Sequence, residues 1–281
     1  MPDSWKGFKK KKDVLICVDS DGCAMDTMDS KHINCFGPCL IPVWGLEPWK
    51  DQILKRWNEI NLYTMTRGIN RFKALAVILA EVQEKYRPIP GLEQFSRWTE
   101  ETSELSGDSI RAAWEQTGNP IFRQAMEWSQ EVNRQIGQMP QDEKKAFPGV
   151  REALAKAHQY ADVAVVSSAN RQAVLEEWDN QKLLPFVDLV LSQDAGTKAE
   201  CIRGLLELGY RKEMALMVGD APGDCQAASE NGVYYYPILV KHEKESWDSF
   251  AEEAVDRLLK GTYGGEYQDK KTEEFKKNLN S

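Results

Sequence analysis

Two acidic residues follow directly on a short apolar run near the start of the chain. The run Val14–Val18 reads VLICV, and Asp19-Ser20-Asp21-Gly22 comes straight after it. Aspartate is common in turns at strand ends, so such a pair can be purely structural. Like charges this close repel each other, however, so the pair can also be a functional site. The remaining acids of the chain decide between the structural and the functional interpretation.

Polar side chains follow the later apolar runs in the same way. These residues are Ser167, Ser168, Lys198, Asp220 and Asp224. In an open parallel sheet ligands bind at the carboxyl ends of the strands, so we expect all of these side chains, with the first two acids, in one crevice. Four carboxylates gathered there would repel unless a cation lay among them, and hard divalent cations prefer oxygen ligands. The sequence therefore predicts Mg²⁺ beside a phosphate group, with lysine and serine as phosphate contacts.

The elements that must position these residues follow from hydrophobic periodicity. Four apolar runs lack polar alternation, as expected for parallel strands covered on both faces. They are Val14–Val18, 163–166, 187–191 and 214–218. Segments with apolar residues at helical spacing separate the last three runs, which predicts alternating strands and helices. A further strand is expected within 234–240, near an edge because Pro237 removes a ladder donor.

More than a hundred residues of different character separate the first run from the others. Trp49, Ile53 and Trp57 recur at helical spacing, and Asn119-Pro120 has the residues of a capped helix start. We therefore expect an α/β core from 1–25 and 147–260 with an all-helical cap from 26–146. The polar segment 261–281 is expected to be a loosely held tail.

Composition excludes some classes of function. A net charge of -8 argues against a general nucleic-acid binder, which needs a basic surface to displace counterions. No stretch approaches the roughly 20 apolar residues of a membrane span, and the apolar run after the basic start is too short for a signal peptide. The six cysteines are scattered, as in proteins of the reducing cytosol, so we expect a cytoplasmic protein with a small-molecule partner. A zinc site at Cys35, Cys39 and His32 is disfavoured because no second ligand pair follows.

A family resemblance brings these residues together. The ordered set that carries it is Asp19-x-Asp21-Gly22, Ser167, Lys198 and Gly219-Asp220-x-x-x-Asp224. This set resembles the four motifs of the haloacid dehalogenase superfamily, and phosphatases dominate that superfamily. The resemblance implies a Rossmann-like parallel sheet with an inserted helical type one cap, as in phosphoglycolate phosphatases and β-phosphoglucomutases. Cys23 departs from the pattern, since the family usually has threonine or valine there.

The resemblance also implies a role for each motif residue. Asp19 would attack phosphorus to form an aspartyl-phosphate, and Asp21 would protonate the leaving alcohol and then activate water. Ser167 and the amide of Ser168 would hold the phosphoryl oxygens, with Gly22 beside them, and Lys198 would neutralise the phosphoryl group. The implied Mg²⁺ ligands are Asp19, Asp21 through its backbone carbonyl, Asp220 and Asp224.

Residues of the insert are candidates on charge and position alone. Arg67 and Arg71 could present an anion-binding edge to substrate, and Lys31 and His32 are further candidates.

The function expected is Mg²⁺-dependent hydrolysis of a small phosphorylated metabolite. A phosphomutase stays open as an alternative, and so does a receiver-like signalling module with Asp194 as phosphate acceptor. Asp21 favours phosphate esters over dehalogenation, because the dehalogenases of the superfamily lack an aspartate at that position. The sequence leaves the oligomeric state open.

Overall fold

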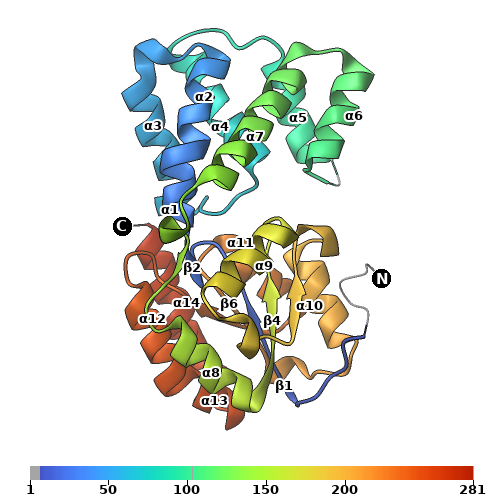
Figure 1. Cartoon of the computed structure of the whole chain (residues 1–281), viewed down its shortest axis with the longest axis vertical. Helices are drawn as coiled ribbons and strands as arrows, with labels where there is room; N and C mark the ends of the chain where they lie inside the picture. Colours follow the sequence, from blue (N-terminus) through green and yellow to red (C-terminus); the bar gives the residue numbers. More distant parts are fainter. Residues whose placement is uncertain (1–6, 103, 281) are drawn as a thin grey trace. The chain divides into compact units, whose positions relative to one another are not determined.

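The chain forms two compact units in the computed structural model, which describes residues 7–102 and 104–280 (Figure 1). One unit comprises Met1–Met28 and Gln141–Ser281, and the other comprises Asp29–Pro140. The second unit is thus an insertion between two parts of the first. None of the helices in the described ranges has both the length and the apolar character needed to cross a membrane.

The first unit is built on a five-stranded sheet in the order β5-β4-β1-β6-β7, with every neighbouring pair parallel. Its strands are β1 (Val14–Val18), β4 (Ala161–Val166), β5 (Leu189–Leu191), β6 (Ala215–Gly219) and β7 (Tyr234–Pro237). The three central strands are buried along their whole length, which explains why their sequences are almost entirely apolar, with Asp162 of β4 as the one charged residue. The chain adds β4 and β5 on one side of β1 and then returns to add β6 and β7 on the other. The topological switch point therefore lies between the carboxyl ends of β1 and β6.

Helices alternate with these strands, as the sequence predicts. They are α8 (Val150–Tyr160), α9 (Arg171–Asn180), α10 (Lys198–Leu206), α11 (Pro222–Asn231), α12 (Glu243–Ser249), α13 (Val255–Leu259) and α14 (Glu266–Leu279). Helix α8 packs on β4, and α11 packs on both β6 and β7. Short 3₁₀ turns η5 (Gln141–Glu143), η6 (Leu184–Phe186), η7 (Gln193–Ala195) and η8 (Lys212–Met214), with the π-helical η9 (Phe250–Ala254), complete the connections. The expected α/β class is confirmed.

The C-terminal segment differs from the expected loose polar tail. Residues Glu266–Leu279 form helix α14, which packs on β7. Phe275 and Leu279, four residues apart, are buried, and the Phe275 ring lies 5.4 Å from that of Tyr235. The Asn278 side chain bonds both the N–H and the carbonyl of Val240. A narrow apolar stripe in a charged segment is thus enough to dock the helix.

The inserted unit is all helical. Its elements are α1 (Met28–Lys31, which crosses the boundary), η2 (His32–Phe36), α2 (Gly37–Trp44), η3 (Glu47–Trp49), α3 (Lys50–Asn58), η4 (Glu59–Tyr63), α4 (Arg71–Lys85), α5 (Leu92–Glu101), α6 (Gly107–Thr117) and α7 (Pro120–Gln138). Trp57 and Trp128 are fully buried with their rings edge to face at 5.7 Å, so the unit has its own core. Asn119 caps α7 through a bond from the Ile121 N–H, as predicted.

A two-stranded ribbon stands where the chain leaves and re-enters the sheet unit. Strand β2 (Met25–Asp26) pairs antiparallel with β3 (Lys145–Ala146). The Phe147 N–H also donates to the Ala24 carbonyl. The two ends of the insertion are therefore tied together by backbone hydrogen bonds within the sheet unit.

Candidate active site

The loop after β1 is a tight turn that starts at the switch point. The Asp19 N–H donates to the Val218 carbonyl on β6, which fixes the residue at the mouth of the sheet. The Ser20 carbonyl then accepts the N–H groups of Cys23, Ala24 and Met25. Gly22 has φ = +82°, a left-handed conformation that glycine adopts without steric cost. The Asp-x-Asp-Gly sequence thus serves the geometry of the turn as well as its chemistry.

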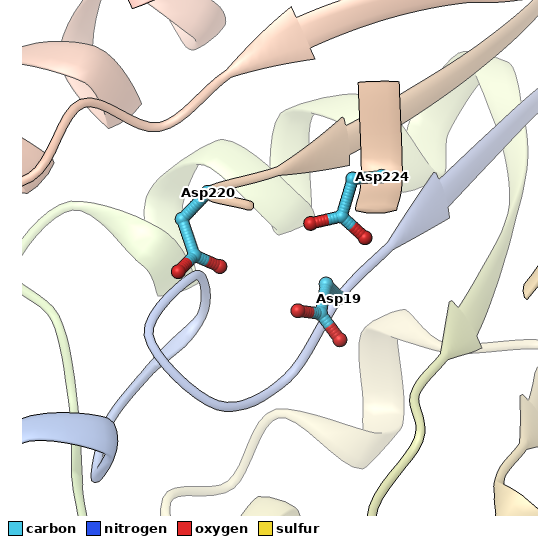
Figure 2. A group of neighbouring side chains, drawn as sticks. All are labelled: Asp19, Asp220 and Asp224. Carbon is cyan, nitrogen blue, oxygen red and sulfur yellow. The ribbon is translucent and has the colours of Figure 1, made fainter. Parts of the chain in front are cut away.

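Three carboxylates from two strand ends meet at this point. The side chains of Asp19, Asp220 and Asp224 are all buried, and one oxygen of each lies within 4.8 Å of the others. Figure 2 shows the three groups gathered around a common space. Asp19 follows β1 and Asp220 follows β6, whereas Asp224 lies in the first turn of α11. The expectation that these acids converge therefore holds for three of the four.

A glycine makes room for the third carboxylate. A Cβ atom on Gly219 would lie 2.3 Å from Cγ of Asp224, closer than real Cβ contacts come. Oδ2 of Asp224 accepts the Ala221 N–H at 3.0 Å, which holds the carboxylate against the end of β6. Sequence reasoning missed this steric role of Gly219, although the Gly-Asp-x-x-x-Asp spacing is a signal for it.

Lys198 supplies positive charge to the group. Its Nζ lies 3.0 Å from Oδ2 of Asp19 and 2.6 Å from Oδ1 of Asp224. Thr197 and Glu200 form a capping box that starts α10 at this lysine. Burial opposes protonation of Lys198, but the carboxylates of Asp19 and Asp224 outweigh it and raise the lysine pKa.

One lysine does not balance three buried acids. Burial raises the pKa of Asp19 well above its ordinary value; Lys198 opposes that rise, and the charges of Asp224 and Asp220 add to it. The donors are hard carboxylate oxygens, which fit Mg²⁺ or Ca²⁺ better than softer metals. The chemistry of this donor set therefore fits a hard divalent cation, whose charge would favour ionised Asp19.

Asp21, two residues after Asp19, does not belong to the group of three carboxylates. Its side chain is partly exposed, and Oδ1 accepts a hydrogen bond from the buried Thr27 hydroxyl at 2.6 Å. This bond fixes the orientation of the carboxyl group. The implied metal contact of Asp21 is through its backbone carbonyl and stays a prediction. Sequence reasoning missed Thr27, for which no periodicity or motif gives a signal.

The two serines after β4 differ in exposure. Ser167 is buried, its N–H donates to the Leu191 carbonyl, and its Oγ accepts the Ala169 N–H at 3.1 Å. Ser168 is exposed. Asn170 caps α9, so Ser167 is not needed for that role. Because β4 neighbours β1, Ser167 and Asp19 lie at the same edge of the sheet.

The two candidate arginines, Arg67 and Arg71, make hydrogen bonds within the helical unit. Arg67 is buried, and its Nη1 donates to the Leu62 carbonyl at 2.7 Å. Nη1 of Arg71 donates to Oγ of Ser129 at 3.1 Å and to Oδ1 of Asn133 at 2.8 Å. Substrate binding by the two arginines stays a prediction.

Other sequence candidates lie outside the carboxylate group. Cys35 and Cys39 are buried and form no disulfide, and among the described residues Asp19, Asp220 and Asp224 are the only group of three or more His, Cys, Asp or Glu side chains placed to hold a metal ion. A zinc site at these cysteines therefore has no support from the structure. Asp194, the acceptor in the receiver interpretation, is exposed and accepts a hydrogen bond from Ser192.

Comparison with known proteins identifies the family. The model for haloacid dehalogenase-like hydrolases matches residues 69–237, which is 169 of the 281 residues. The chain belongs to this family. The matched range contains Ser167, Lys198 and the acids after β6, whereas Asp19 and Asp21 precede it. The prediction of a haloacid dehalogenase superfamily hydrolase is confirmed.

A solved structure supports the fold of this hydrolase. It is similar to a haloacid dehalogenase-like hydrolase from Bacteroides fragilis, with 16% identity, a TM-score of 0.53, and coverage of 84% of this chain and 93% of that chain. A haloacid dehalogenase-like family protein from Streptococcus pneumoniae shares 17% identity at a TM-score of 0.45, over 88% of this chain and 90% of that chain. At 16% identity the likeness to the Bacteroides fragilis protein shows the fold alone. No curated protein sequence gave a significant match.

Proposed function

We propose that this haloacid dehalogenase-like hydrolase is a Mg²⁺-dependent phosphatase that acts on a small phosphorylated metabolite through an aspartyl-phosphate on Asp19. The observation that carries the proposal is the meeting of Asp19, Asp220 and Asp224 with Lys198 at the switch point of the sheet. Asp21, two residues from Asp19 and held by Thr27, supports it as a separate group for proton transfer. Three buried oxygen ligands and one ammonium suit a phosphoryl group better than an uncharged substrate.

The residues that would hold Mg²⁺ are Asp19, Asp220 and Asp224, with the backbone carbonyl of Asp21. When bound, the ion would neutralise the carboxylates and polarise a phosphoryl oxygen. Lys198 bridges Asp19 and Asp224 and would keep Asp19 ionised as a nucleophile. Ser167, at the neighbouring strand end, would hold a phosphoryl oxygen together with the Ser168 amide.

In the proposed reaction Asp19 is the nucleophile of the first half and the leaving group of the second, and Asp21 carries the proton in both. In the first half an oxygen of Asp19 bonds to phosphorus, the bond from phosphorus to the ester oxygen breaks, and Asp21 gives its proton to the leaving alcohol. In the second half Asp21 takes a proton from water, the water oxygen bonds to phosphorus, and phosphate leaves Asp19. The Thr27 hydroxyl, which donates to Oδ1, would fix the orientation of the Asp21 carboxyl group during both proton transfers.

Asp21 also bears on the choice between phosphate esters and haloacids within the family. An alkoxide leaving group needs a proton, whereas a halide leaves without one. The orientation of Asp21 by Thr27 therefore favours ester hydrolysis over dehalogenation. A small phosphorylated metabolite as substrate requires neither a nucleic-acid nor a membrane partner. The six cysteines, all within the described residues, form no disulfide, which fits a reducing, cytoplasmic compartment.

The test is a screen of phosphate release from phosphorylated metabolites, with and without Mg²⁺. Wild-type protein is expected to release phosphate only with the cation, and Asp19→Asn is expected to abolish release. Asp194→Asn is the matched control, since it removes the charge of an exposed aspartate after another strand of the same sheet and is expected to keep full activity. Release that survives Asp19→Asn would refute the nucleophile. Isomerised ester without free phosphate would indicate a phosphomutase, and halide release from haloacids would indicate a dehalogenase.

A further inference from the structure

A tryptophan on α9 contacts the residue that lies between the two aspartates. Nε1 of Trp178 donates to Oγ of Ser20 at 2.9 Å, although the residues are 158 positions apart in the sequence. Both side chains have no exposed surface. Trp178 belongs to the hydrophobic core of the sheet unit, so its ring is held on all sides while its N–H reaches the loop.

Ser20 can hold the loop because both its side-chain hydroxyl and its backbone carbonyl form hydrogen bonds. A buried hydroxyl without a partner is unfavourable, and the indole N–H, which can only donate, satisfies it. The Ser20 carbonyl accepts three N–H groups of the turn that follows. Any movement of Ser20 would therefore break several buried hydrogen bonds together.

A second indole holds the far side of the same turn. Nε1 of Trp247, on α12, donates to the Cys23 carbonyl at 3.0 Å, and this tryptophan is also fully buried. The turn is thus attached to two helices of the sheet unit at points on either side of Asp21 and Gly22. Of the two contacts, only the one from Trp178 reaches the residue that directly joins Asp19 to Asp21.

We propose that Trp178 is a positioning residue. It acts through Ser20 to hold Asp19 and Asp21 at fixed positions relative to each other and to Asp220. The inference rests on the proposed function, because the expected effect on rate depends on the catalytic roles proposed for Asp19 and Asp21. Helix α9 begins at Arg171, four residues after Ser167, so the same helix would also keep the phosphate-binding loop and the acid loop at a fixed separation. A misplacement of about 1 Å in such a site can cost about 100-fold in rate, which sets the scale of the expected effect.

The test compares three variants in steady-state phosphate release with saturating Mg²⁺. Trp178→Phe keeps most of the ring volume and removes the N–H, and Ser20→Ala removes the acceptor with the smaller change in packing. Each is expected to lower kcat by about 10-fold to 100-fold while KM changes less than about threefold. The double variant is expected to be no slower than the slower single variant, because both substitutions remove the same bond.

Tyr263→Phe is the matched control. It also removes a buried hydrogen bond to the sheet unit, from the Tyr263 hydroxyl to the Tyr235 carbonyl at 2.8 Å, away from the acid loop. It is expected to lower the melting temperature about as much as Ser20→Ala does while kcat stays at the wild-type value. If Trp178→Phe and Ser20→Ala behave like this control, Trp178 serves packing alone and the inference is overturned.

The hydrogen bond can also be measured without activity. The indole ¹⁵N–¹H resonance of Trp178, assigned by its loss in Trp178→Phe, is expected to shift in Ser20→Ala. A resonance that does not move would overturn the inference whatever the substrate is. Wild-type protein that releases no phosphate would refute the proposed function, whereas active wild type with unchanged kcat in both variants would refute the positioning role alone.

Discussion

Replacement of Gly219 by alanine tests whether the three carboxylates act as one group. The added Cβ would lie 2.3 Å from Cγ and 2.4 Å from Oδ2 of Asp224, where ordinary contacts begin at 3.4 Å. The Asp224 side chain must therefore move by about 1 Å. Gly219 does not have a positive φ, so the effect is steric and involves no backbone strain.

That displacement would disrupt both hydrogen bonds that hold the Asp224 carboxylate in place. Its bond to Lys198 at 2.6 Å and its bond from the Ala221 N–H at 3.0 Å would both lengthen beyond good geometry. We expect Gly219→Ala to lower the rate of phosphate release by about 100-fold and to weaken Mg²⁺ binding by about 10-fold or more.

The assay is phosphate release over a Mg²⁺ titration, with calorimetry for the binding of the ion alone. Gly223→Ala, four residues further on, is the control, because a Cβ there meets nothing within 4 Å and is expected to change neither quantity. Wild-type turnover and Mg²⁺ affinity in folded Gly219→Ala protein would refute the reasoning that Asp224 must hold this position.

Three further predictions concern charge, pH and packing. Lys198→Met is expected to slow phosphate release by about 100-fold or more and, without Mg²⁺, to lower the free energy of unfolding by about 3 kcal/mol in urea, because two buried acids lose their cation. Burial opposes ionisation of Asp188, but the hydrogen bonds from Lys11 and the Val163 N–H outweigh it and lower the Asp188 pKa. The stability this gives is present above the unfolded-state pKa and is lost as pH falls through the lower folded-state pKa, so Asp188→Asn should flatten the loss of melting temperature below about pH 4. Phe275→Ala is expected to cost about 3 to 5 kcal/mol in urea unfolding, whereas a loosely held tail would show no change.

The strands show how far local sequence pattern determines this fold. The first strand spans Val14–Val18 as predicted, because an unbroken apolar run between a charged segment and two acids has few alternative structures. The third was expected over 187–191, but β5 is limited to Leu189–Leu191 because a 3₁₀ turn at Leu184–Phe186 delays its start. Helix α14 was missed because its apolar stripe is narrow and gains stability only from docking on β7.

The site shows where sequence reasoning ends. Order and strand-end placement predicted that Asp19, Asp220 and Lys198 would meet, because all parallel strands of one sheet point the same way. The contact between Ser20 and Trp178 depends on how α9 packs, and no pattern local to either residue carries that information. The same holds for Thr27, whose hydroxyl reaches Asp21 only after the turn has formed.

The central claim, that Asp19 accepts the phosphoryl group, is tested most directly by trapping the intermediate. Wild-type protein would be mixed with a turned-over phosphate ester and Mg²⁺, quenched in acid and reduced with borohydride, which converts a phosphorylated aspartate into homoserine. Peptide mass spectrometry is expected to find homoserine at position 19 in the wild-type protein and none in Asp19→Asn. Homoserine at position 194 instead, or steady phosphate release with no modified aspartate, would contradict the account.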